Sequence, residues 1–154
     1  MVIGLESSGY HSNGYSLIRK VFEGEYDQYR QWLLEPTRLY VEAALVLKKE
    51  FEIHAMAHMT GGGIENLPRV LPEHLKAVVQ KWELPECFKE VQKRAQISDQ
   101  QMRETFNCGM GLMLMIKATQ AEAAVARLDQ VGYKARVLGV VKSKNEGDAH
   151  VEWA

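Results

Sequence analysis

The sequence has little cysteine, little net charge and no long apolar run, and each absence argues against a class of protein. Its two cysteines, Cys87 and Cys108, lie far apart and lack the spacing of metal ligands, which argues against a disulfide framework or a zinc site. The formal net charge is −1, so the basic excess typical of nucleic-acid-binding proteins is missing. No run of about 18 apolar residues could span a membrane, and the N-terminus lacks a signal-peptide pattern. We expect a protein of the reducing cytoplasm, with neither nucleic acid nor membrane as partner.

What the sequence does contain is the composition of an ordinary folded domain. Of its 154 residues, 46% are hydrophobic and 25% are charged, which fits a single domain over residues 1–154. Short apolar runs predict strands at Val2–Leu5, Ile53–Met59, Ala77–Val79, Gly111–Lys117, Lys134–Lys142 and His150–Trp153. Helical spacing predicts helices at 15–22, Glu25–Leu34, Leu39–Phe51, Ile64–Val70, Pro85–Ala95, Ser98–Arg103 and Thr119–Val131.

These strands and helices alternate irregularly, and the last third reads strand, helix, strand, strand. This order predicts an α+β fold in which a central mixed β-sheet is covered by helices. The strand at Gly111–Lys117 is apolar throughout, so it is expected in the interior of the sheet, and Ile53–Met59 is also expected to be buried. Asn13 and Ser98 are the expected N-caps of the helices that follow them.

Polar and small residues crowd into one segment near the N-terminus. It contains Ser7, Ser8, Gly9, His11, Ser12, Asn13 and Gly14. Glycines let backbone N–H groups approach a ligand closely, and the following helix would present its N-terminus to an anion. The imidazole of His11 can donate, accept or transfer a proton near neutral pH. A surface loop with tight turns explains the same composition, and by composition alone it is the commoner explanation.

A second glycine-rich segment, Thr60–Gly63, joins an apolar strand to a short helix and contains Gly61, Gly62 and Gly63. Strand, glycine loop and helix is the general plan of a phosphate-binding loop. It is not a P-loop, because the Gly-Lys-Ser/Thr ending is absent. A tight connection without a ligand explains the segment equally well. Arg38 and Arg69 lie beside a proline turn or the glycine loop, and either could reach a bound anion.

Other chemistry-bearing residues favour structural explanations. His54 and His58 would share a face of their strand, but no further Cys or His completes a metal site, so no metal site is expected. Gly109-Met110-Gly111 is best explained as a tight entry into a strand. The methionines at 110, 113 and 115 are expected in the core.

Four separated segments resemble the C-terminal domain of aminoimidazole ribonucleotide synthetase (phosphoribosylformylglycinamidine cyclo-ligase). Gly4–Leu17 contains Ser-Ser-Gly-Tyr-His-Ser-Asn-Gly, and Leu34–Val41 contains Glu-Pro-Thr-Arg. His58–Pro72 contains Thr-Gly-Gly-Gly with Glu-Asn-Leu-Pro-Arg-Val-Leu-Pro, and Thr105–Gly111 contains Thr-Phe-Asn-Cys-Gly. The resemblance runs from residue 4 to about residue 141, and the order of the segments makes it specific.

The resemblance implies a reaction and a division of labour between two domains. The family's N-terminal domain makes a homodimer and supplies most contacts to ATP and Mg²⁺, and the C-terminal domain closes the cleft. ATP activates the formamide oxygen of formylglycinamidine ribonucleotide, and an internal amine then closes the imidazole ring in purine biosynthesis. His11 and Asn13 are the expected catalytic residues. The residues expected to bind the substrate or a phosphate are Ser7, Ser8, Gly9, Ser12 and Gly14, together with Thr60, Gly61, Gly62 and Gly63.

Two departures from the family pattern limit this expectation. The ATP-binding and dimerisation domain is absent from these residues, so the chain alone is expected to be inactive and to need that domain as its partner. Glu104 stands where the family usually has Arg, and Arg103 would point elsewhere on a strand, so neither receives a role. Two alternatives stay open: a non-catalytic module that binds a phosphorylated ligand or a protein partner, and another enzyme of the superfamily, of the formylglycinamidine synthetase, selenide water dikinase or thiamine monophosphate kinase type.

Overall fold

The computed structural model describes all residues, 1–154, and contains one six-stranded mixed sheet in the order β2-β4-β1-β5-β3-β6. Neighbouring strands pair antiparallel except β3 and β6, which run parallel. The prediction of an α+β fold with a mixed sheet is therefore confirmed. The strands are β1 Val2–Glu6, β2 Ile53–His58, β3 Leu75–Val79, β4 Met110–Ile116, β5 Ala135–Ser143 and β6 Val151–Trp153.

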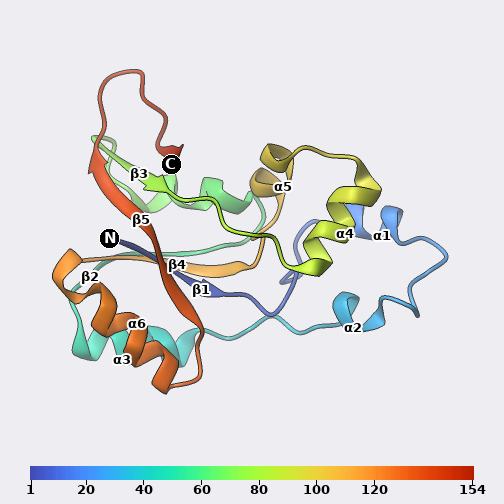
Figure 1. Ribbon diagram of the computed structural model, residues 1–154, viewed down its shortest axis with the longest axis horizontal. Helices are drawn as coiled ribbons and strands as arrows, with labels where there is room; N and C mark the ends of the chain where they lie inside the picture. Colours follow the sequence, from blue (N-terminus) through green and yellow to red (C-terminus); the bar gives the residue numbers. More distant parts are fainter.

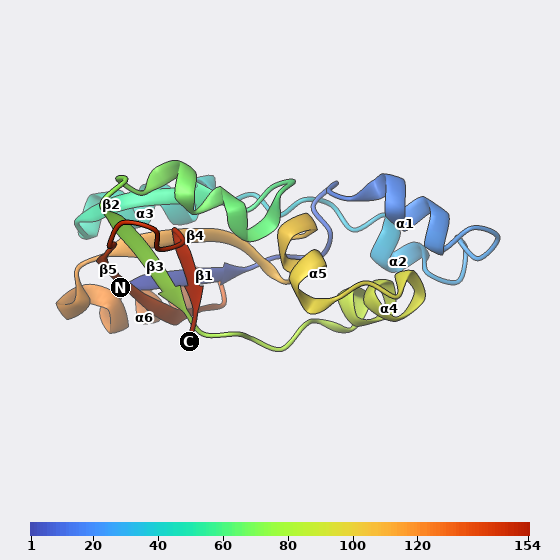
Figure 2. The same cartoon turned by 90° about the horizontal axis from the view of Figure 1, so that it is seen from above.

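Helices cover both faces of this sheet and extend beyond one end of it. The α-helices are α1 Tyr15–Val21, α2 Arg30–Leu33, α3 Val41–Glu50, α4 Glu86–Ala95, α5 Asp99–Thr105 and α6 Ala121–Gln130. The 3-10 turns are η1 Gly63–Asn66, η2 Pro68–Val70 and η3 Ala118–Gln120. In Figure 1, α3 and α6 lie below the sheet, and the green 3-10 turns lie above it. Figure 2 shows α1, α2 and α4 gathered at the end of the molecule opposite α3 and α6.

The hydrophobic core is divided by the sheet into two clusters, because successive side chains of a strand point to opposite faces. On β4, Leu112 and Leu114 pack with α3 and α6, whereas Met113 and Met115 belong to the cluster on the other face. All seven residues of β4 are buried, as an interior strand requires. The predictions of an interior strand and of core methionines are confirmed.

The prediction that Ile53–Met59 is a buried strand is wrong in one respect. A strand forms there, but β2 lies at the edge of the sheet with β4 as its one neighbour. Only Ala57 of its six residues is buried, and His54 and His58 are exposed. Apolar composition could not reveal this, because the position of a strand in a sheet is set by the order of long-range pairings.

Of the two predicted helix caps, Ser98 is confirmed and Asn13 is wrong. The Ser98 hydroxyl accepts a hydrogen bond from Gln101 N–H at 3.1 Å, and the Gln101 side chain accepts one from Ser98 N–H at 2.8 Å. This reciprocal pair is a capping box. Asn13 does not cap α1, because Gly14 occupies the cap position with φ 69° and the Asn13 amide donates to His11 O at 2.9 Å.

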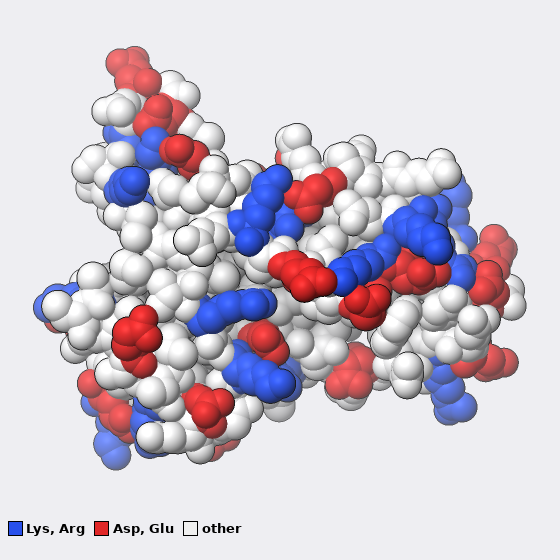
Figure 3. All heavy atoms as spheres, viewed as in Figure 1, with Lys and Arg blue, Asp and Glu red and all other residues white.

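Two predicted helices are shorter or differently wound than expected. Within Glu25–Leu34 the helix is limited to Arg30–Leu33, and turns precede it. The segment Ile64–Val70 forms two 3-10 turns separated at Leu67, because Pro68, the first residue of the second turn, has no N–H to continue a helical hydrogen-bond series. None of the helices combines the length and apolar character needed to traverse a bilayer. Acidic and basic side chains are interspersed over the face drawn in Figure 3.

Candidate functional site

Three loops meet at one edge of the sheet, and the strand directions explain why. Strands β1 and β2 both run antiparallel to β4, which lies between them. The ends of β1 and β2 therefore lie at the same edge as the start of β4, with Glu6 opposite Met110 and His58 opposite Leu112. The loops that continue from these ends are Ser7–Gly14, Thr60–Gly63 and 106–109. The two glycine-flanked segments singled out in the sequence are thus neighbours in space.

Close contacts between these loops depend on their glycines. A methyl group on Gly61 would lie 3.7 Å from Asn13 Oδ1, which places the Asn13 carboxamide against the glycine loop. A methyl group on Gly14 would lie 2.2 Å from the Phe106 ring. One on Gly63 would lie 2.0 Å from Arg103 O and 2.5 Å from Phe106 O. Phe106 therefore lies beneath both glycine-flanked loops, and larger side chains at Gly14 or Gly63 would separate them.

Left-handed backbone conformations concentrate in these loops. Four non-glycine residues have positive φ, and three of them lie here: His11 at 52°, Ser12 at 61° and Cys108 at 51°. The fourth, Gln96, ends helix α4, a common place for this conformation. The left-handed region costs an L-residue about 1–2 kcal/mol, so three such residues must be held by their surroundings. Strain of this kind is typical of functional loops.

His11 is buried, with 5% of its surface exposed, and its contacts define its chemistry. Its Nε2 accepts hydrogen bonds from the backbone N–H groups of Ser8 at 3.1 Å and Arg38 at 3.3 Å. Since Nε2 is an acceptor, we assign the ring proton to Nδ1, which has no hydrogen-bond partner. Burial, followed by the charges of His58 and Arg38, lowers the pKa of His11 to about 4. Near neutral pH the imidazole is therefore uncharged, an arrangement suited to positioning two loop segments.

The serines beside His11 are also engaged within the protein. Ser8 Oγ donates to Pro36 O at 2.7 Å, which connects the Ser7–Gly14 loop to the segment before α3. Ser7 Oγ lies 2.9 Å from Asn107 Oδ1 and 3.1 Å from Gly9 O. Ser12, by contrast, is exposed, and its side chain makes no hydrogen bond within the chain.

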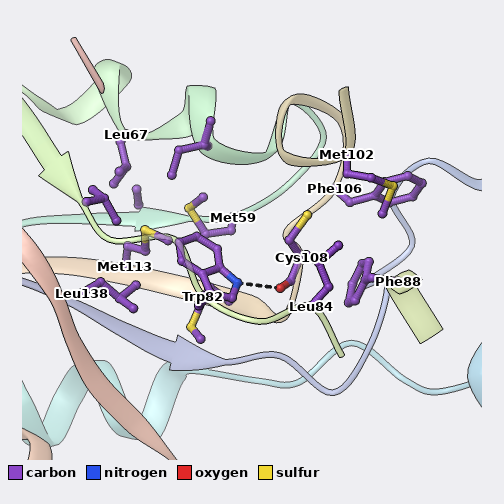
Figure 4. Packing of buried hydrophobic residues seen from close by; sticks show 14 of the residues in the cluster. Met59, Leu67, Trp82, Leu84, Phe88, Met102, Phe106, Cys108, Met113 and Leu138 are labelled. Atoms are coloured by element: carbon purple, nitrogen blue, oxygen red, sulfur yellow. Dashed lines mark hydrogen bonds between the residues drawn. The ribbon is translucent and has the colours of Figure 1, made fainter. Parts of the chain in front are cut away.

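Asn107 is a residue that the sequence analysis quoted within a motif but did not assign to the site. It is 1% exposed, and its amide donates to Gly9 O at 2.9 Å. Its Oδ1 accepts from Gly109 N–H at 2.8 Å. In the same loop, Trp82 Nε1 donates to Cys108 O at 2.7 Å, the dashed line of Figure 4. The sequence signal that could have identified Asn107 is its carboxamide, which lies two residues before a glycine in Thr-Phe-Asn-Cys-Gly.

Asn66 organises the glycine loop from within and was likewise not assigned. Its amide donates to Gly63 O at 2.8 Å and, at 3.4 Å, to the carbonyls of Thr60 and Gly61. Its Oδ1 accepts from the Thr60 hydroxyl at 3.2 Å. The loop carbonyls are thus turned toward Asn66, and the N–H groups of Gly61 and Gly62 have no acceptor within the chain. Two adjacent free N–H groups are the donors that an anion needs.

Arg69 places a positive charge beside these donors. Its Nη1 donates to Asn66 Oδ1 at 3.1 Å, and its Nη2 would lie 3.6 Å from a methyl group on Gly62. Neither Arg69 nor Arg38 forms an ion pair with a carboxylate of the chain. Each guanidinium therefore keeps its charge available to a ligand.

The side chains of the site do not favour chemistry by a thiolate or by a bound metal ion. Burial raises the pKa of the Cys108 thiol to about 12, so the thiolate is scarce at neutral pH. No group of three or more His, Cys, Asp or Glu side chains is placed to hold a metal ion. The groups left for a ligand are the donors Ser12 Oγ, the N–H groups of Gly61 and Gly62 and the Arg69 guanidinium, together with the acceptor Asn13 Oδ1.

A family model described as "AIR synthase related protein, C-terminal domain" matches residues 1–152. The chain belongs to this family. Curated relatives of this AIR synthase related domain include the phosphoribosylformylglycinamidine cyclo-ligases of Magnetococcus marinus and Neisseria meningitidis serogroup C, each 43% identical over 97% of the chain. The chain spans about half the length of these relatives, 46% and 47% respectively.

Solved structures show the same fold for this AIR synthase related domain. A Thermus thermophilus protein superimposes with a TM-score of 0.62 at 17% identity, over 99% of this chain and 48% of that one. Thiamine-monophosphate kinase from Stenotrophomonas maltophilia gives a TM-score of 0.61 at 16% identity, over 99% and 49%. At these identities the likeness concerns the fold alone.

Arg103 of the AIR synthase related domain differs from its expected setting. It lies on helix α5 rather than on a strand, and it is 5% exposed. Its Nε contacts the Asp99 carboxylate at 3.0 Å, and its guanidinium stacks on the Trp82 and Trp153 rings at 4.9 and 5.1 Å. Glu104 accepts a hydrogen bond from Gln100 on the same helix at 2.7 Å. Both residues are explained by contacts within the domain.

Proposed function

We propose that this chain is the substrate-side half of an ATP-dependent cyclo-ligase that converts formylglycinamidine ribonucleotide to aminoimidazole ribonucleotide. The observation that carries the proposal is the meeting of the Ser7–Gly14 and Thr60–Gly63 loops, with Asn13 Oδ1 against Gly61. The curated relatives that share 43% identity are cyclo-ligases by name, which supports this substrate.

In this proposal the glycine loop binds a phosphate. The free N–H groups of Gly61 and Gly62 and the unpaired guanidinium of Arg69 surround one place on the surface. Hydrogen bonds from a guanidinium to a phosphate are charge-assisted and are stronger than neutral ones. The phosphate is the ribose 5′-phosphate of the substrate or the phosphoryl group that ATP would supply when bound.

The Ser7–Gly14 loop has two tasks in this proposal. Ser12 and Asn13 Oδ1 face outward and orient the substrate. Ser7, Ser8 and Gly9 act by holding the loop in its left-handed conformation, through their bonds to Pro36 and Asn107. His11 contributes as an uncharged hydrogen-bonding group that joins the loop to Arg38, rather than as an acid near neutral pH.

We assign the remaining parts of the machinery to the half of the protein that precedes this domain. Mg²⁺ needs several oxygen ligands, and this chain offers no cluster of acidic side chains for them. That half would hold Mg²⁺ and most of ATP and would form the homodimer. Residues 1–154 form one domain that is inactive alone, and the whole enzyme works in the cytoplasm.

Reassembly tests the proposal. The chain is mixed with the first half of the Magnetococcus marinus relative, ATP, Mg²⁺ and formylglycinamidine ribonucleotide, and phosphate release is measured. We expect turnover from the mixture and none from the chain alone. A folded, reassembled pair without turnover would refute the assignment.

Calorimetry with ribose 5-phosphate tests the phosphate site on the chain itself. Replacing Arg69 by Gln should weaken binding about tenfold or more, since a hydrogen bond to a charged group contributes about 1.5–3 kcal/mol. Arg30→Gln is the matched control, because Arg30 is also exposed and without an ion pair but lies on α2. Equal binding by both variants would argue against the site. Tight binding that the added first half leaves unchanged would instead support a non-catalytic phosphate-binding module.

A further inference from the structure

Helix α3 and the residue two positions before it expose three large apolar side chains. Leu39 is 76% exposed, Val41 65% and Leu45 63%. On the opposite side of the helix, Ala43 and Leu47 are fully buried against the sheet. A helix on the surface of a protein usually carries polar residues on its outer side. The outer side of helix α3 exposes Val41 and Leu45 among charged residues, so its first turns have the mixed apolar and charged composition of a contact surface.

The backbone beneath these side chains is held firmly in place. Tyr133 donates its hydroxyl proton to Leu39 O at 3.0 Å, and Tyr40 donates to Glu6 O at 2.8 Å. These bonds anchor two neighbouring residues, Leu39 and Tyr40, at the point where the chain enters helix α3. The apolar side chains are presented to solvent on a fixed frame.

This apolar surface borders the candidate site. Arg38, next to Leu39 in the chain, donates its backbone N–H to His11, and the Tyr40 ring lies 6.0 Å from the His11 ring. A partner domain that covered Leu39 and Val41 would therefore also approach the loop that holds His11. The surface and the site would be completed by the same partner.

We propose that Leu39, Val41 and Leu45 form the docking surface for the half of the protein that precedes this domain. The inference rests on the proposed function, because that function places an ATP-binding half beside the Ser7–Gly14 loop. The occupant follows from the relatives, of which the chain covers 46–47%. Lys48 and Lys49 lie at the far end of the same helix side, and neither forms an ion pair. The docking half accordingly presents an apolar centre with carboxylates opposite these lysines.

The size of the surface fits the centre of such an interface. Contacts between domains of one chain bury roughly 600–1,500 Å², and a few central apolar residues dominate the binding free energy. Val41 and Leu45 on helix α3, with Leu39 just before it, are a suitable centre for that contact, with the neighbouring lysines at its rim.

Binding of two separately produced halves tests the proposal without any substrate. The first half of the Magnetococcus marinus relative is titrated into the chain and into a triple variant, Leu39→Asp, Val41→Asp and Leu45→Asp. We expect the triple variant to bind about 30-fold more weakly or worse, the loss typical of disrupting a central contact. Leu34→Asp is the matched control, since Leu34 is 67% exposed but lies beside α2, and it should bind within about twofold of the unchanged chain.

Three results would overturn the inference: no binding by the unchanged chain, equal binding by the triple variant, or an effect of the triple variant confined to self-association of the chain. Urea denaturation of each variant confirms that the exposed substitutions leave the fold intact. Turnover is measured separately, so a tight complex without phosphate release would refute the proposed reaction and leave the docking surface supported.

Discussion

The protonation of His11 gives the sharpest test of how the candidate site is built. Its pKa of about 4 lies below the ordinary value of 6.5, because burial disfavours the charged ring. Between these two values the unfolded chain binds a proton that the folded chain does not. Stability therefore rises with pH through this window, is fully present above about pH 6.5, and is lost as the pH falls toward 4.

The expected size follows from the two pKa values. Between pH 7.5 and pH 4.5, proton linkage at His11 should lower the free energy of unfolding by roughly 2–3 kcal/mol. His11→Gln removes this titration while its Oε1 can still accept from Ser8 N–H and Arg38 N–H, which now donate to Nε2. The two proteins share every other titrating group, so the difference between them reports on His11 together with its interaction with the charges of His58 and Arg38.

Urea denaturation at a series of pH values measures this difference. We expect the stability gap between the two proteins to change by roughly 2–3 kcal/mol over the range, with the unchanged chain losing more at low pH. Imidazole nitrogen shifts in NMR should also place the ring proton on Nδ1. Parallel stability curves, or a proton on Nε2, would show that His11 is not the buried acceptor described above.

Three further predictions concern the frame of the site, and each is measured as a loss of unfolding free energy in urea. Gly63→Ala should cost about 2–5 kcal/mol, since it adds steric overlap with backbone to a left-handed φ of 49°. Gly132→Ala, at φ 83° with open space around it, should cost only about 1 kcal/mol, and equal losses would contradict the steric argument. Asn107→Ala should cost about 2–4 kcal/mol by leaving buried backbone groups unpaired, and a loss below 1 kcal/mol would show that other groups replace it. Ser98→Ala should cost about 1 kcal/mol, and no loss would mean that the capping box adds nothing to stability.

Local signals in the sequence were reliable where the answer depends on neighbours in the chain. The continuous apolar run of β4 predicted an interior strand, because only burial on both faces suits such a run. Ser98 followed three residues later by Gln101 predicted a helix start, since both groups act within one turn. The order of strands and helices was enough to predict the α+β class.

Predictions failed where long-range contacts compete with a local preference. Asn13 has the chemistry of a helix cap, yet its amide bonds to His11 O and Gly14 takes the cap position. Strand β2 has the composition of a buried strand, yet it lies at an edge. No local pattern specifies which of several apolar strands will have two neighbours.

The sequence by itself determined the candidate segments, because glycines, hydroxyls and carboxamides in Ser7–Gly14 and Thr60–Gly63 are a matter of composition and order. Only the tertiary structure decided how these segments lie relative to one another. The directions of β1, β2 and β4 bring the two segments to one edge, and the Asn66 amide binds the carbonyls of the glycine loop. Burial, followed by the charges of His58 and Arg38, leaves His11 uncharged near neutral pH. Proximity and burial arise from pairings between residues far apart in the chain, and these exist only after the sheet has formed.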